Sequence, residues 1–193
     1  MSTKILVIPE DFTKDEHILK PLVEKLVEEA GFPRATVTVC RDPNFQGVAA
    51  AMNESRIRTE VIERYPMVDI FIQLVDRDGL AGREVAARNL ETKFNQELAP
   101  KHKRFFAELA RQEVEVFILA GHELDNGVSW QVIRDDANVK NTFFQSLVRR
   151  EGTESLPHQG RKKLMAAAIR NFQRIMSRCD DDLGNLLERL RHQ

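Results

Sequence analysis

Two aspartates come directly after a long apolar run in this chain. Residues 68–75 are mostly apolar, and Asp76, Arg77, Asp78 and Gly79 follow them. In an extended chain, residues two positions apart point to the same side, so Asp76 and Asp78 can direct their carboxylates at one divalent cation. The competing interpretation is turn chemistry, because Asp and Gly are favoured where a chain leaves a strand.

Two more carboxylates follow an earlier apolar run. Residues 4–8 are rich in β-branched side chains and lead through Pro9 to Glu10 and Asp11. In open α/β sheets, ligands bind at the carboxyl ends of the parallel strands, so the acids behind both runs are expected at one edge of a sheet. This convergence favours a cation site over a simple turn.

The elements that would hold these acids alternate between strands and helices. A capping box of Thr13 and Glu16 is expected to open the first helix, at about 13–30. The hydrophobic pattern predicts the other helices at about 47–64, 83–98 and 103–111. Strands are predicted at 4–8, 35–40, 68–75 and 113–120. Such alternation predicts an α/β fold with a mostly parallel four-stranded sheet flanked by helices.

The remainder of the chain carries helical patterns without strands. Helices are expected at about 129–149 and, after a Gly/Pro-containing break over 152–160, from Lys162 onward. We therefore expect an α/β core over residues 1–125 and a C-terminal helical extension over 126–193 that packs on the core. No second independent domain is required at this length.

Composition excludes several classes of protein. Charged residues make up 31% of the 193 residues but cancel to a formal net charge of −1, so the basic surface of a non-specific nucleic-acid binder is absent. Cys40 and Cys179 lie far apart, which argues against a disulfide framework and a zinc site. No signal peptide or membrane span is visible, so a cytoplasmic protein is expected. The sequence leaves the oligomeric state open.

The acidic residues and their order resemble a known family. Glu10 after the first strand, a helix opening near Asp15, and Asp76-x-Asp78 after a later strand resemble the TOPRIM domain of topoisomerases, primases and overcoming-lysogenization-defect nucleases. The resemblance covers about residues 4–120. Residues 113–120 and 160–164 resemble, more narrowly, small stand-alone TOPRIM-like proteins that are often associated with bacterial antiviral defence.

The resemblance implies a nuclease that uses Mg²⁺ or Mn²⁺ to cleave DNA or RNA. It places Glu10, Asp76 and Asp78 in both metal binding and catalysis. The family commonly has Gly directly after the first acid, whereas this chain has Asp11. Which of Glu10, Asp11 and Asp15 contacts the metal therefore stays open. Two further catalytic candidates are Glu115 and Lys163.

Each of the two further candidates also has a simpler interpretation. Glu115 would be a solvent-facing residue on an edge strand. Arg161, Lys162 and Lys163, which open the last helix, would form a solvated polar face or would contact phosphate. If Lys163 is catalytic, its charge would neutralise a phosphate in the transition state.

Two other functions remain possible on sequence grounds. The chain is small and has no P-loop of its own. The alternative prediction is therefore that it is a non-catalytic or partner-activated subunit that binds an ATPase. The third hypothesis is a phosphohydrolase or receiver-like α/β domain that acts on small phosphates, with Asp11 as the attacking residue. Topoisomerase activity is disfavoured, because the only tyrosine, Tyr65, lies at the end of a predicted helix.

Overall fold

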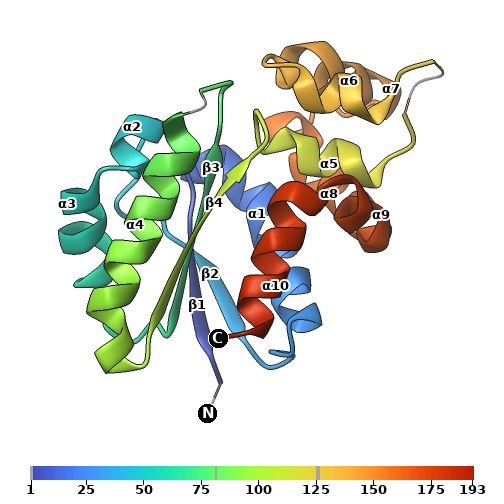
Figure 1. Ribbon diagram of the computed structural model, residues 1–193. Helices are drawn as coiled ribbons and strands as arrows, with labels where there is room; N and C mark the ends of the chain where they lie inside the picture. The colour runs from blue at the N-terminus through green and yellow to red at the C-terminus, as the bar shows by residue number, and fades with distance from the viewer. Residues whose placement is uncertain (1, 81, 125–126) are drawn as a thin grey trace.

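The computed structural model describes residues 2–80, 82–124 and 127–193 and has an α/β fold. One four-stranded, all-parallel sheet has the strand order β2-β1-β3-β4, which confirms the predicted fold class (Figure 1). The strands are β1 (Lys4–Ile8), β2 (Thr36–Val39), β3 (Ile70–Asp76) and β4 (Arg104–Ala110). The carboxyl ends of β1, β3 and β4 are therefore neighbours along one edge of the sheet.

Helices cover both faces of the sheet. Side chains alternate between the faces, so Ile5 and Val7 of β1 belong to one buried cluster and Leu6 and Ile8 to the other. On the first face lie α1 (Phe12–Glu29) and α10 (Asn185–Arg191), with α5 (Glu115–Gly121) and α8 (Arg161–Ile169) packed beside α1. On the second lie α2 (Val48–Ala51), α3 (Glu54–Arg56), the π-helix η1 (Ile57–Ile62) and α4 (Gly82–Leu98).

The C-terminal part is helical but more divided than the sequence pattern predicts. The segment expected at about 129–149 consists of α6 (Trp130–Asp135), the π-helix η3 (Lys140–Phe144) and α7 (Gln145–Arg150). After the 3-10 helix η4 (Pro157–Gly160), the expected single helix is split into α8, α9 (Phe172–Arg178), the π-helix η5 (Asp180–Gly184) and α10. Backbone angles outside the helical region at Asn171 and Cys179 cause the breaks. The side-chain amide of Asn171 donates to the carbonyl of Gly121 at 2.9 Å.

Two of the expected elements are exchanged. Residues 103–111 were expected to be a helix and 113–120 the fourth strand, and both expectations are wrong: β4 occupies Arg104–Ala110, and α5 follows it at Glu115–Gly121. Every residue of α5 is buried, so the apolar run that resembled a central strand is a helix surrounded by other elements. A short apolar run has no period that distinguishes these two states. The 3-10 helix η2 (Ala99–Lys101) leads into β4.

The start of α1 also differs from the expected capping box of Thr13 and Glu16. Asp11 is the N-cap, and its carboxylate accepts the backbone N–H of Thr13 at 3.0 Å. The backbone N–H of Asp11 donates to Asp15 Oδ2 at 2.9 Å. Glu16 pairs instead with Arg41 at 2.9 Å. The reciprocal cap is thus made by two aspartates, which places Asp15 on the first turn facing the end of β1.

The described helices include none that could act as a membrane span, because each is too short or too polar.

Candidate functional site

Carboxylates from three neighbouring strand ends gather at the carboxyl edge of the sheet. Glu10 follows β1, Asp76 is the last residue of β3, and Glu115 opens α5 just after β4. Asp15 adds a fourth carboxylate from the first turn of α1. We call Glu10, Asp15, Asp76 and Glu115 the acidic cluster. The sequence predicted that acids from two strand ends would lie together. Because β4 and α5 are exchanged relative to the prediction, Glu115 adds a carboxylate from a third strand end.

Asp76 has the other three carboxylates of the cluster around it. Its Oδ1 accepts the backbone N–H of Val114 at 2.8 Å. Burial raises the pKa of Asp76 well above its usual value, and the nearby charges of Asp15, Glu115 and Glu10 raise it further. The ionised form of this carboxyl is therefore disfavoured unless a positive charge joins the cluster.

Asp15 is the second strongly perturbed acid. Asp15 is only 8% exposed, and this burial is the main reason why its pKa is raised to about 7. The charges of Glu115, Asp11 and Glu10 act in the same direction, while the hydrogen bond from the backbone of Asp11 opposes them. This carboxyl gains and loses its proton near neutral pH, as a group that transfers protons needs to do.

Glu10 contributes an oxygen that has no donor. Among the described residues, its buried Oε2 has no hydrogen-bond partner. Burial and the charge of Asp78 raise the pKa of Glu10, and the charge of Arg83 and a backbone hydrogen bond from Val48 lower it. A buried carboxylate oxygen without a donor is costly, and a cation would satisfy it.

Glu115 is held by a buried arginine. Its Oε1 accepts from Arg161 Nη2 at 2.5 Å, and Lys140 Nζ lies 3.7 Å from the same oxygen. The guanidinium of Arg161 also lies over the ring of Phe144, 4.8 Å from its centroid. Glu115 is thus neither a solvent-facing residue on an edge strand nor a free carboxylate. It is a buried residue at the start of a helix, and its charge is balanced.

Asp78 lies at the rim of the cluster and is held by Arg83. Its backbone has a positive φ of 48°, an uncommon conformation for a residue other than glycine. The Asp78 N–H donates to the carbonyl of Gln112 at 3.0 Å, and its Oδ2 accepts from Arg83 Nη1 at 2.6 Å. Asp76 and Asp78 therefore differ in environment, because Asp76 is half-buried among carboxylates and Asp78 is exposed beside a guanidinium.

The two remaining predicted site residues have other surroundings. Asp11 caps α1, and its oxygens contact Thr13 and the ammonium of Lys14. Burial raises the pKa of Asp11, but these contacts outweigh it and the net pKa is lowered. Lys163 is exposed on α8. Within the described part of the chain, it forms no hydrogen bond or ion pair with the acidic cluster.

The sequence did not predict the contacts that Arg83 and Arg161 make with the carboxylates of this region. Arg83 had no assigned role, although its position in the first turn after Asp78 is a local signal that could have suggested a contact. Arg161 was expected either on a polar face or against phosphate, and its contact with Glu115 spans 46 residues. No sequence signal reveals such a distant pair.

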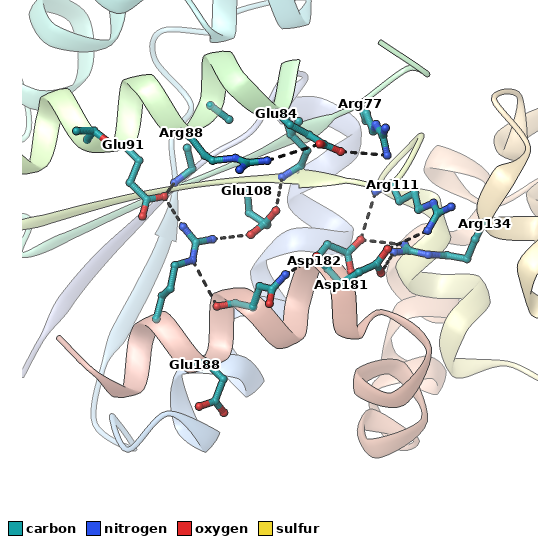
Figure 2. A pocket seen from close by; sticks show the side chains of 16 residues that line it. Arg77, Glu84, Arg88, Glu91, Glu108, Arg111, Arg134, Asp181, Asp182 and Glu188 are labelled. Atoms are coloured by element: carbon teal, nitrogen blue, oxygen red, sulfur yellow. Dashed lines mark hydrogen bonds and ion pairs between the residues drawn. The ribbon is translucent and has the colours of Figure 1, made fainter. Parts of the chain in front are cut away.

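A groove with a volume of about 700 Å³ lies apart from the cluster, along the edge of β4 between α4 and the C-terminal helices (Figure 2). Arginines and acids line it in nearly equal numbers and pair with one another, so it has no preference for anions. Its acids include Glu91 and Asp182, which accept the backbone N–H groups of Ala107 and Arg111 at 2.8 and 3.3 Å. This groove is therefore a reinforced sheet edge rather than an extension of the acidic cluster.

The fold and the cluster define an α/β protein with an acidic site at the carboxyl ends of parallel strands. Among residues 2–80, 82–124 and 127–193, no group of three or more His, Cys, Asp or Glu side chains is arranged to hold a metal ion. Comparisons with protein-family models, with curated proteins and with solved structures give no match to this chain.

Proposed function

We propose that this protein is a TOPRIM-like nuclease that uses Mg²⁺ or Mn²⁺ to hydrolyse phosphodiester bonds in DNA or RNA. The observation that carries the proposal is the environment of Asp76, a half-buried carboxylate with Asp15, Glu115 and Glu10 around it. Four carboxylates at the meeting point of three strand ends repel one another. A divalent cation is the chemical partner that relieves this repulsion.

The donor set fits magnesium in its chemistry. Mg²⁺ takes oxygen ligands and is usually held by one or two carboxylates together with water and substrate phosphate. Glu10 and Asp76 would hold the ion, since Glu10 offers a buried oxygen without a donor. Asp78 would join them after its contact with Arg83 is broken. Glu115 would stay with Arg161 and contribute negative charge at the back of the site.

The remaining residues would divide the chemistry between proton transfer and phosphate binding. A magnesium ion bound here would polarise a phosphoryl oxygen and lower the pKa of an attacking water. Asp15, with its pKa of about 7, would accept or return a proton near neutral pH. Lys140 and Arg83 border the cluster and would offer positive charge to a phosphate.

A cleavage assay on single- and double-stranded DNA and RNA tests the proposal. We expect cleavage by the wild type only with Mg²⁺ or Mn²⁺, and its loss in the double variant Asp76→Asn with Asp78→Asn. Because the loss of outer-shell partners of a metal already costs about 10- to 100-fold, the loss of two ligands should cost at least about 100-fold.

Glu24→Gln is the matched control for this assay. Glu24 is an exposed acid on α1, the helix that carries Asp15, and its variant should cleave like the wild type. Equal cleavage by the wild type and the double variant would reject the proposed site. Absence of any metal-dependent cleavage by the isolated chain would reject a nuclease that acts alone.

One observation favours a second candidate, a subunit that becomes active only in a complex, such as one with a partner ATPase. Arg83 and Arg161 hold Asp78 and Glu115, so two carboxylates of the region are engaged within the chain. A partner that draws either arginine away would free a carboxylate. Cleavage that appears only after the partner is added would support this candidate, and cleavage by the isolated chain would count against it.

A further inference from the structure

We propose that Arg83 is an internal cation that occupies the metal-binding position at Asp78 and must leave before a divalent ion can bind there. The inference rests on the proposed function and adds a regulatory step to the same site. Among the described residues, no group of three or more His, Cys, Asp or Glu is arranged to hold a metal ion, and the contact with Arg83 withholds Asp78 from such a group.

The contacts of Arg83 are those that a hard cation would make. Its Nη1 donates to Asp78 Oδ2 at 2.6 Å and to the backbone carbonyl oxygen of Asp76 at 2.9 Å. Carboxylate and backbone carbonyl oxygens are both common ligands of hard divalent ions. One nitrogen of the guanidinium therefore takes two oxygens at the end of β3 that an ion could otherwise use.

The position of Arg83 in its helix does not account for these contacts. Arg83 lies in the first turn of α4, where the helix dipole disfavours a positive charge. Its side chain is nevertheless only 15% exposed, whereas the Asp78 side chain is 42% exposed. The guanidinium is held in an unfavourable field by the two oxygens, and its charge points toward the acidic cluster.

Arg83 and a metal ion would therefore compete for Asp78. If the ion binds only when Arg83 has moved away, the apparent dissociation constant is the intrinsic one divided by the fraction of molecules with Asp78 free. The pair is open to solvent on its Asp78 side, where the side chain is 42% exposed, and an arginine–carboxylate pair that water screens is weak, so that fraction is not negligible. Removal of the guanidinium should tighten metal binding by about twofold to sixfold.

Isothermal titration of Mn²⁺ and Mg²⁺ into the wild type and Arg83→Gln tests this competition directly, without an activity assay. Two control variants separate the contact from a general loss of positive charge. Arg88→Gln changes an arginine on the same helix whose side chain is 77% exposed. Arg88 Nη2 lies 3.8 Å from Glu84 Oε2. Arg77→Gln removes the charge between the two aspartates, and this arginine pairs with Glu84 at 3.1 Å.

We expect tighter binding of both ions by Arg83→Gln and unchanged binding by the two controls, with circular dichroism confirming that every variant is folded. Binding by Arg83→Gln that equals or falls below that of the wild type would overturn the competition and leave the proposed function standing. Equal tightening in Arg77→Gln would also overturn it, because the effect would then come from net charge. If neither the wild type nor Arg83→Gln binds either ion, the proposed function fails as well.

Discussion

Glu115 and Arg161 form an ion pair with both side chains almost entirely removed from water. Their side chains are 4% and 3% exposed, and both were candidates for catalysis or phosphate binding on sequence grounds. A buried charge is tolerated when a partner balances it, and removal of one partner leaves the other uncompensated. The pair therefore joins α5 to α8 behind the acidic cluster, and Glu115 is better placed to position its neighbours than to bind a ligand itself.

This arrangement predicts a large asymmetry between single and double variants. Arg161→Met should lower the free energy of unfolding by about 3–5 kcal/mol, because Glu115 keeps a buried charge that Lys140, 3.7 Å away, balances in part. Arg161→Met with Glu115→Gln should recover most of that loss, since no buried charge remains. Urea denaturation monitored by circular dichroism measures both values. Equal destabilisation in the single and double variants would contradict a compensating pair.

At the scale of elements, α5 shows what the sequence could and could not reveal. The apolar runs of β1 and β3 were predicted from the sequence because β-branched residues crowd both, and their acidic ends followed from the topology. Residues 104–110 contain Ala, Glu and Leu, which favour helices, yet they form β4 because the edge of β3 offers a partner. Tertiary packing overrode local propensity in both β4 and α5.

The same element carries a close approach that can be tested. A Cβ at Gly121, the last residue of α5, would lie 2.5 Å from the Cβ and 2.6 Å from the Cα of Ala168 on α8. Gly121→Ala should therefore force the two helices apart and destabilise the protein by about 1–3 kcal/mol, despite the better helix propensity of alanine.

Thermal unfolding of Gly121→Ala beside Gly82→Ala measures this effect. A Cβ at Gly82, the first residue of α4, would meet nothing within 4 Å, so its variant should be neutral or slightly more stable. Equal melting temperatures for the two variants would show that α5 and α8 adapt to the added methyl group without cost.

At the scale of the whole molecule, the C-terminal helices and the sheet are joined across the edge of β4 by a charged network. Arg189 of α10 contacts Glu91 of α4 and Glu108 of β4, and Arg134 of α6 pairs with Asp182 at 2.9 Å. Burial raises the pKa of Glu108 to about 7, and the charge of Arg189 only partly offsets it. The network therefore makes the stability of the molecule depend on pH.

The direction of that dependence follows from the raised pKa of Glu108. Below about pH 4.5 the carboxyl is protonated in both states, and between about pH 4.5 and 7 only the unfolded state loses the proton. The stability of the wild type relative to Glu108→Gln should therefore fall, by about 3 kcal/mol, as pH rises through this window and then level off.

Urea denaturation of the wild type and the variant at several pH values measures the difference. Glu188→Gln is the control, because Glu188 lines the same groove with a side chain that is 59% exposed. This variant shows how the loss of one exposed acid from the groove changes the free energy of unfolding at each pH. A difference between the wild type and Glu108→Gln that stays constant with pH would mean that Glu108 is ionised in the folded protein throughout the window.

The covered edge of β4 also bears on how copies of this chain meet one another. With a formal net charge of −1, the molecules repel one another only weakly, so charge offers little protection against self-association. The outward backbone N–H groups of Phe105, Ala107 and Arg111 already donate to side chains of the same chain. A strand from a second molecule would have to displace those three acceptors before it could pair with β4, which makes growth of the sheet from one copy to the next unfavourable at this edge.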